Sequence, residues 1–224
     1  MKWLLDMVDK QGKEKLYCPS CAPIELDESC NTNTNSTCIF GKLNDFGKLN
    51  DFGKLNDFVK NKGLKIFHQN VNSLVRKIEK LRLMLQETSK RIHIFGITES
   101  HLNKNIQDSE VAISGYNFIR KDHKNGCGGG VGCYIRDDIK WKRRSDLDKQ
   151  SVEALWIEIF FQNSNSILLC IIYRPPDSSK YLDANFENNF EEINSLATEE
   201  RKETIVIGDL NCNYLNNGDH KSIK

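Results

Sequence analysis

From residue 64 onward the hydrophobic positions follow two periods, one typical of β-strands and one typical of α-helices. Continuous or alternating apolar runs predict strands over 64–70, 92–100, 116–121, 128–135, 152–161, 166–173 and 204–211. The neighbouring runs 152–161 and 166–173 predict a hairpin. Strands that follow one another directly and through helices indicate an α/β domain with a mixed sheet.

Two segments carry apolar residues at helical spacing. A helix over 73–87 is predicted by Leu74, Ile78, Leu81 and Leu85, and Asn72 or Ser73 could cap it. A second helix over 185–197 is predicted by Phe186, Phe190, Ile193 and Leu196. In each helix the four residues would share one face and pack against a sheet.

Residues 1–63 have a different character. The tract NTNTNST at 31–37 is polar and of low complexity, and FGKLND then occurs three times in succession, at 40–45, 46–51 and 52–57. A unit of six residues is too short for a solenoid repeat, and a tandem duplication within a linker explains it. A short hexad array with its own fold is the alternative. We therefore expect a low-order N-terminal segment over 1–63 and one folded domain over 64–224.

Composition and charge exclude few classes of protein. The hydrophobic fraction of 38% allows a packed core, and the net charge of +1 gives no whole-chain electrostatic case for a nucleic-acid partner. The longest apolar run, at 167–173, is too short to cross a bilayer, and the N-terminus lacks a signal-peptide core. We expect a chain that is not secreted and not bound to a membrane, in the nucleus or the cytoplasm.

The eight cysteines divide into two groups. Cys18 and Cys21 form a C-x-x-C pair that could bind zinc with Cys30 and Cys38, although the spacing lacks a second close pair; free thiols are the alternative. The later four are Cys127, Cys133, Cys170 and Cys212, which are explained most simply as small buried hydrophobic residues.

The strands end in oxygen-bearing side chains. Three apolar runs end at Asn70, Glu99 and Tyr173. The last predicted strand ends with Asp209 and Asn211, whose side chains would face the same side of the sheet if the chain stayed extended. Taken singly, each residue is explained by a turn, a cap or a surface position. Gathered at one sheet edge, they would form an all-oxygen site of the kind that Mg²⁺ prefers.

Two further stretches have simple explanations beside functional ones. The glycine-rich NGCGGGVGCYI lacks the Gly-Lys-Ser/Thr ending of a phosphate loop, and a turn with close strand packing explains it. The basic cluster around Lys140, Trp141 and Arg143 could contact DNA phosphates, or could simply be a solvated charged loop.

Five short motifs in order carry a resemblance to a known family: HQNVNSL at 68–74, GITESHLN at 96–103, GCGGGVGCYI at 126–135, IIYRPPDS at 171–178 and IVIGDLNCN at 205–213. Together they resemble the endonuclease/exonuclease/phosphatase superfamily, most closely the endonuclease domain of non-LTR (LINE-type) retrotransposon polyproteins. The resemblance implies a four-layered α/β sandwich of the DNase I-like type. It also implies phosphodiester hydrolysis dependent on Mg²⁺ (or Mn²⁺), in which a retroelement endonuclease nicks DNA.

The resemblance assigns roles to the residues at the strand ends. Glu99 would coordinate the metal with Asp209, and Asp209 would also align or deprotonate the attacking water. Asn70 would support the metal and the phosphate, while Asn211 and Tyr173 would contact the scissile phosphate. Arg174, next to Tyr173, would join the basic cluster in binding DNA. The protein would act as a monomer.

One part of the family pattern has no counterpart. The family ends in a Ser-Asp-His motif, and none of His68, His93, His101, His123 and His220 stands in that context. We therefore expect a sandwich that is incomplete at the C-terminus and hydrolysis impaired by truncation. The alternative is a remnant that binds nucleic acid or protein without catalysis.

Overall fold

The structure, a computed structural model, describes residues 63–88, 92–124 and 128–211. Before residue 63 it describes the backbone of four short strands: β1 (Lys2–Trp3), β2 (Leu5–Val8), β3 (Glu14–Tyr17) and β4 (Cys38–Lys42). β2 and β3 form a separate antiparallel pair, whereas β1 and β4 each join a larger sheet. The predicted division at residue 63 stays a prediction.

Two five-stranded sheets make up the centre of the molecule. In the first, with the order β4-β5-β6-β8-β7, β5 (Leu64–Asn70) runs parallel to β6 (Ile94–Thr98). Its other strands, β7 (Tyr116–Lys121) and β8 (Val131–Arg136), are antiparallel to each other. Both parallel and antiparallel neighbours are present, as the strand pattern predicts.

The second sheet has the order β1-β12-β11-β10-β9. β11 (Ile167–Tyr173) is parallel to β12 (Glu203–Asp209) and antiparallel to β10 (Glu153–Phe160), which confirms the predicted hairpin. At the edge, β9 (Lys140–Arg143) pairs with β10. Two short 3₁₀ helices, η1 (Asp108–Val111) and η2 (Ser145–Leu147), lie in the connections.

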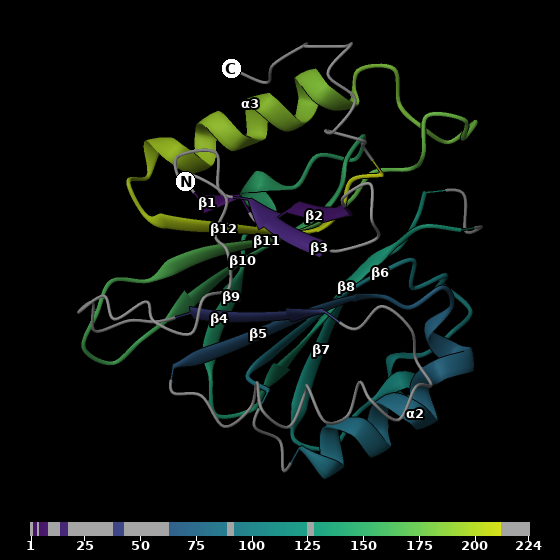
Figure 1. Ribbon diagram of the computed structural model, residues 1–224, viewed down its shortest axis with the longest axis vertical. Helices are drawn as coiled ribbons and strands as arrows, with labels where there is room; N and C mark the ends of the chain where they lie inside the picture. Colours follow the sequence, from purple (N-terminus) through teal and green to yellow (C-terminus); the bar gives the residue numbers. More distant parts are fainter. Residues whose placement is uncertain are drawn as a thin grey trace.

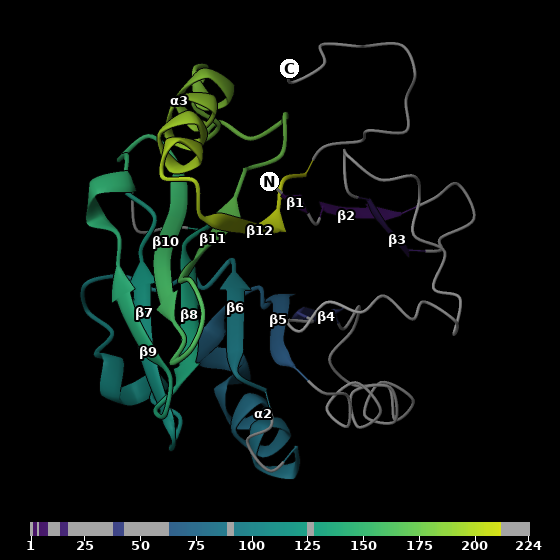
Figure 2. The same ribbon diagram turned by 90° about the vertical axis from the view of Figure 1, so that its left-hand side faces the viewer.

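The two helices lie on the outer faces of the two sheets, as Figures 1 and 2 show. α2 (Leu74–Glu87) covers the first sheet and α3 (Phe186–Glu199) covers the second. A third apolar cluster fills the space between the sheets, with members from both that include Ile66, Ile94, Ile171 and Ile207. Helix, sheet, sheet and helix therefore form the predicted four-layered α/β sandwich.

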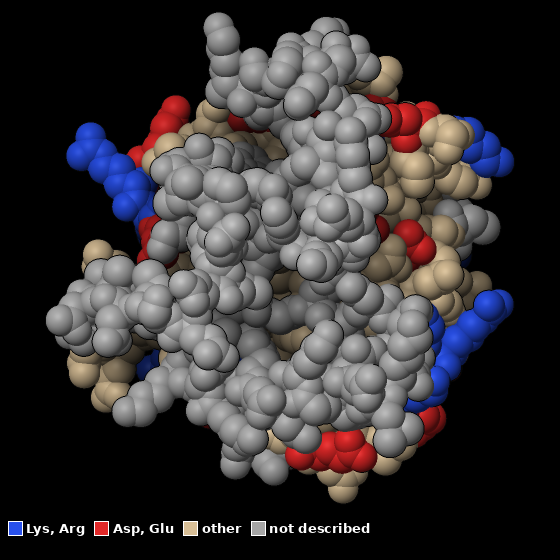
Figure 3. Space-filling model, viewed as in Figure 1, with Lys and Arg blue, Asp and Glu red and all other residues tan. Residues whose placement is uncertain are grey.

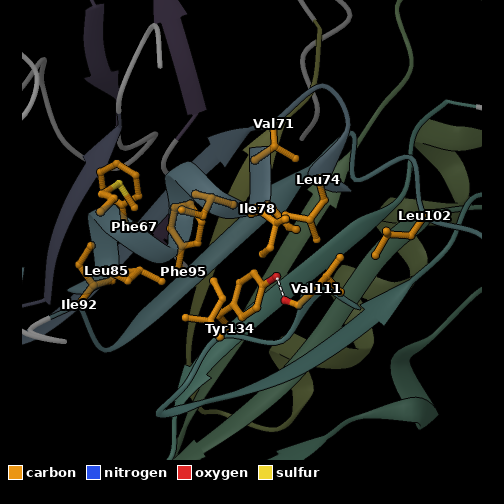
Figure 4. Packing of buried hydrophobic residues seen from close by; sticks show 14 residues of the cluster. Phe67, Val71, Leu74, Ile78, Leu85, Ile92, Phe95, Leu102, Val111 and Tyr134 are labelled. Carbon is orange, nitrogen blue, oxygen red and sulfur yellow. Dashed lines mark hydrogen bonds between the residues drawn. The ribbon is translucent and has the colours of Figure 1, made fainter. Parts of the chain in front are cut away.

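The α2 face of the first sheet illustrates the packing (Figure 4). Phe67 and Phe95 stack with ring centroids 5.3 Å apart, in the same apolar cluster as Leu74 and Ile78 of the helix. The hydroxyl of Tyr134 donates a hydrogen bond to the Val111 carbonyl at 2.6 Å, so its polar atom is satisfied inside the apolar cluster. The four apolar positions predicted for this helix are all buried.

Two predictions about packing need comment. On α3 the buried face contains Ala197 rather than Leu196, which is 45% exposed, because the buried positions continue by four residues from Ile193. Cys133 and Cys170 are buried free thiols, as expected, while Cys127 and Cys212 fall outside the described residues. Among the helices described, none is long and apolar enough to cross a membrane.

Candidate functional site

Three of the predicted polar side chains converge where strands of both sheets end. Asn70 closes β5 and Asp209 closes β12 in the other sheet, while Glu99 follows β6. The amide nitrogen of Asn70 donates to Glu99 Oε1 at 2.8 Å and to Asp209 Oδ2 at 2.9 Å. The two carboxylates are therefore held on either side of one nitrogen atom.

The orientation of the Asn70 amide follows from its third contact. Its oxygen accepts a hydrogen bond from the backbone N–H of Asn72 at 3.1 Å, which leaves the nitrogen to face the carboxylates. Two like charges side by side repel, and a neutral donor between them reduces that repulsion. The same arrangement favours a cation, which would be attracted by both carboxylates.

Glu99 is placed by an unusual backbone. It has a positive φ of 51°, which is uncommon for a residue other than glycine. Its carbonyl accepts the N–H of Ser73 at 2.9 Å, and the next carbonyl, of Ser100, accepts that of Leu74 at 2.9 Å. The start of α2 is thus bound to the Glu99 segment. Ser73, one of the two predicted caps, is the N-cap residue of α2, but its side chain makes no capping hydrogen bond.

The glycine-rich turn before β8 supports the same segment from the other side. The carbonyls of Gly129 and Gly130 accept the N–H groups of His101 and Ser100 at 3.0 and 3.1 Å. Gly130 has φ +83°, and a Cβ there would lie 2.5 Å from the hydroxyl oxygen of Ser100. The turn packs closely, as predicted, and this close packing fixes the backbone of Glu99.

Tyr173 ends β11 beside the carboxylates. Burial, followed by the charge of Glu99 and a hydrogen bond to it, raises the pKa of the Tyr173 hydroxyl above its ordinary value. The hydroxyl therefore keeps its proton at neutral pH and can act as a hydrogen-bond donor.

Asn211 is displaced from the predicted position. The chain does not stay extended after Asp209, because Asn211 adopts a left-handed φ of 47°. Its N–H donates to Asp209 Oδ1 at 3.2 Å, and its side-chain amide donates to the Arg174 carbonyl at 2.9 Å. Asn211 thus steadies Asp209 and the end of β11, and the expectation that it faces the same side through an extended strand is wrong.

The donor set fits a hard divalent cation. Glu99 and Asp209 offer carboxylate oxygens alone, and Mg²⁺ commonly takes one or two protein carboxylates and completes its shell with water. In the described part of the chain, no group of three or more His, Cys, Asp or Glu side chains lies close enough together to hold a metal ion. An ion at this site would therefore be bound by the two carboxylates and by solvent or substrate oxygens.

A cavity of about 230 Å³ opens beside Glu99 and Tyr173. It is also lined by His123 and Glu153, which form a hydrogen-bonded pair with Nδ1 and Oε1 2.6 Å apart. His101 lies at the same cavity, with Nε2 3.7 Å from Glu99 Oε2. Sequence reasoning missed the pair because its members stand thirty residues apart and no motif links them.

The predicted DNA-binding residues occupy varied surroundings. Arg174 is buried, with its guanidinium 2.6 Å from Asp177 and 5.8 Å from the ring centre of Phe186. Arg143 donates to Asp148 at 2.9 Å, and Trp141 packs against the core between the sheets. Lys140 is exposed.

The Lys and Arg side chains visible on the face in Figure 3 lie apart at its edges, and those of the described residues form no continuous basic surface there. Lys140, Trp141 and Arg143 all lie on the edge strand β9, and their contact with DNA stays a prediction. The predicted zinc pair, Cys18 and Cys21, falls outside the described residues.

Comparisons with known proteins give similarity in fold. No family model matches the chain, and no curated protein matches it by sequence. Among solved structures, the chain is similar to the endonuclease domain of TRAS1, a telomere-specific non-LTR retrotransposon, with 15% identity over 66% of this chain and 58% of that one (TM-score 0.46). It is also similar to a 3′-5′ exonuclease from Neisseria meningitidis, with 15% identity over 65% and 57% (TM-score 0.48).

The catalytic domain of Xenopus laevis APE2 is a third match, with 17% identity over 66% of this chain and 58% of that one (TM-score 0.49). A Neisseria 3′ phosphatase bound to a product DNA hairpin also matches. The chain spans about 58% of the length of the first of these structures.

Proposed function

We propose that this chain carries a divalent-cation-dependent phosphodiesterase site that acts on DNA, as the nicking endonuclease of a retroelement. The observation that carries the proposal is the Asn70 amide that joins Glu99 and Asp209 across the two sheets. Two carboxylates in this arrangement suit Mg²⁺ or Mn²⁺, and the retroelement assignment rests on the five sequence motifs.

The chemistry of the proposed reaction follows from the residues present. A cation held by Glu99 and Asp209 would polarise the phosphate and neutralise the charge that develops on its oxygens. Asp209, which accepts a hydrogen bond from Asn70, would accept a proton from an attacking water. Tyr173, protonated and buried beside Glu99, would donate its one hydroxyl proton to a phosphate oxygen in place of Glu99.

The test combines cation binding with DNA cleavage. Wild-type protein should bind Mn²⁺ in a calorimetric titration. It should convert supercoiled plasmid into the nicked form only when Mg²⁺ or Mn²⁺ is present, and at a low rate, because the sequence contains no Ser-Asp-His motif. Glu99→Gln should weaken Mn²⁺ binding at least about tenfold, because a ligand charge is lost. Asp209→Asn should lower the nicking rate by about 10²–10⁴-fold, the usual contribution of a positioned acid–base group.

Glu199→Gln serves as the control, since that carboxylate is exposed at the end of α3. It should leave both measurements unchanged. Nicking that persists in Glu99→Gln and Asp209→Asn would contradict the proposal. DNA binding with no cation-dependent cleavage under any condition would favour the non-catalytic remnant.

A further inference from the structure

A histidine and a carboxylate outside the proposed metal site line the same cavity. His123 follows β7 and Glu153 begins β10, and their side chains are only 8% and 13% exposed. Nδ1 of the imidazole lies 2.6 Å from one carboxylate oxygen. The other carboxylate oxygen accepts the N–H of Gly130 at 2.5 Å. Glu153 is therefore fixed at both oxygens, and its position fixes the imidazole ring.

The glycine-rich turn makes this arrangement possible. Gly129 has φ +55°, and a Cβ at that position would lie 2.6 Å from Oε2 of Glu153. Any side chain there would displace the carboxylate from His123. The turn that supports the Glu99 backbone thus also leaves space for His123 and Glu153. The Glu99 side and the His123 side of the cavity are therefore both positioned by this turn.

The pair leaves one nitrogen without a partner. With a carboxylate at Nδ1, that nitrogen carries the proton and donates it in a hydrogen bond. Nε2 is buried and makes no hydrogen bond to any described residue. A purely structural histidine in a protein interior normally satisfies both nitrogens. An oriented imidazole with a free Nε2 at a cavity wall is typical of a group that contacts a ligand.

The surroundings indicate which ligand would fit. The cavity also contains Glu99, the predicted metal ligand, and Tyr173, a hydroxyl donor. Tyr181 packs edge-on against the imidazole with ring centres 5.1 Å apart, and it is 37% exposed. A small anion that enters beside Tyr181 could reach Nε2 while staying next to the cation site.

We propose that His123, oriented by Glu153, binds a phosphate oxygen of the nucleic acid in the cavity that Glu99 also lines. When it is protonated, the imidazole donates from both nitrogens, to Glu153 through Nδ1 and to the phosphate through Nε2. His123 would touch the substrate, while Glu153 acts as a positioning residue. The proposal rests on the proposed function for the identity of the substrate.

The experiment follows the individual histidines by NMR on full-length protein labelled with ¹⁵N-histidine. The probes are inorganic phosphate and a twelve-nucleotide DNA duplex, each titrated with EDTA and then with Mg²⁺. The Nε2 signal of His123 should shift and saturate with both probes, while its Nδ1–H signal stays in place. His93 is the internal control, because its Nδ1 accepts the Lys65 N–H at 2.9 Å, away from the cavity.

Two variants separate phosphate binding from a structural role. His123→Asn keeps an amide donor near the Nδ1 position for Glu153 but removes Nε2. It should retain stability and lose phosphate affinity by about tenfold or more, the usual effect of removing a hydrogen bond to a charged group. Glu153→Gln should weaken phosphate binding less, and the His123 tautomer signals should broaden or shift as the ring loses its fixed orientation.

Each outcome decides a different point. A His123 signal unmoved by both probes, or wild-type phosphate affinity in His123→Asn, would overturn the inference. A response to inorganic phosphate alone would overturn the assignment to nucleic acid. The titration is also performed without metal, so phosphate binding at His123 is measured independently of cation-dependent cleavage. Binding without cleavage would support this inference and contradict the proposed function, and cleavage without binding would do the opposite.

Discussion

Replacement of Asn70 by alanine tests whether its amide holds the two carboxylates together. In the wild-type structure one nitrogen donates to both Glu99 and Asp209, at 2.8 and 2.9 Å. Asn70→Ala removes both hydrogen bonds and leaves two like charges facing each other across the junction of the sheets. The variant should therefore unfold more easily, most of all in the absence of a divalent cation.

The size of the effect follows from the two contacts. A hydrogen bond to a charged group contributes about 1.5–3 kcal/mol, and a partly exposed site places each contact at the lower end of that range. Some of the lost interaction returns as hydration of the carboxylates. We expect the free energy of unfolding to fall by about 2–3 kcal/mol in EDTA.

A cation should reduce this difference. A ligand at a hundred times its dissociation constant adds about 2.7 kcal/mol to the stability of a protein that binds it only when folded. In Asn70→Ala the cation also relieves the repulsion that the amide no longer offsets. The gap between variant and wild type should therefore be smaller in saturating Mg²⁺ than in EDTA.

The assay is urea denaturation followed by tryptophan fluorescence, to which Trp156 contributes from a fully buried position beneath α3. Asn188→Ala is the matched control, because Asn188 is exposed on that helix and should tolerate alanine. An Asn70→Ala variant within about 0.5 kcal/mol of wild type, like an ordinary surface substitution, would refute the bridging role. A gap that widens in Mg²⁺ would refute the idea that a cation takes over from the amide.

Two further predictions concern the fold and its pH dependence. Gly208→Ala should prevent the β11–β12 pairing and abolish soluble, cooperatively folding protein, because a Cβ there would lie 1.9 Å from the Ile172 carbonyl oxygen. Gly128→Ala is the control for backbone strain alone, because Gly128 has φ +76° but its added Cβ would meet nothing within 4 Å. A normal circular dichroism melt of Gly208→Ala would contradict the reasoning. Burial, together with Arg136 and Lys65, lowers the pKa of His93 from 6.5 to about 4. As the pH falls, His93 therefore takes up a proton in the unfolded chain before it does so in the folded protein. The free energy of unfolding that neutral His93 contributes is present above pH 6.5 and is lost as the pH falls toward 4. His93→Gln should flatten the stability profile between those pH values, and an unchanged slope would show that His93 is not the group responsible.

The fold could be read from the sequence because its signals are local. The periodicity of apolar residues in 64–88 and 152–211 depends on which faces of the helices and strands are buried. The buried faces observed agree with the predicted ones except at Leu196, because a helical pattern does not distinguish between two adjacent positions at the edge of a face. The N-cap of α2 lies at Ser73, a predicted residue, but its side chain makes no capping hydrogen bond. The first N–H groups of the helix are instead bonded by carbonyls of the Glu99–Ser100 segment, and no local pattern reports such a contact.

The candidate site was predictable as a set of residue types and only partly as a geometry. Strand ends in α/β sheets predict that Asn70, Glu99 and Asp209 gather at one edge. The left-handed turn at Asn211 was not predictable, because the position of a strand end is set by pairing with β11 and by the Arg174 carbonyl. The His123–Glu153 pair depends on the turn of Gly129 and Gly130. The sequence predicts the turn but does not predict which side chains pack against it.

The site exists because the two sheets approach closely where its residues leave them. Gly96 lies on β6, three residues before Glu99, and a Cβ there would meet Ile171 at 3.0 Å and Ile207 at 3.1 Å on the facing sheet. Those isoleucines lie on the strands that end at Tyr173 and Asp209. A larger residue at position 96 would push β6 away from both strands and draw Glu99 away from the Asn70 amide. The apolar contact between the sheets thus sets the distance between the two carboxylates. Because the ligands of this cation site come from different sheets, their order depends on the packing of the core between the sheets.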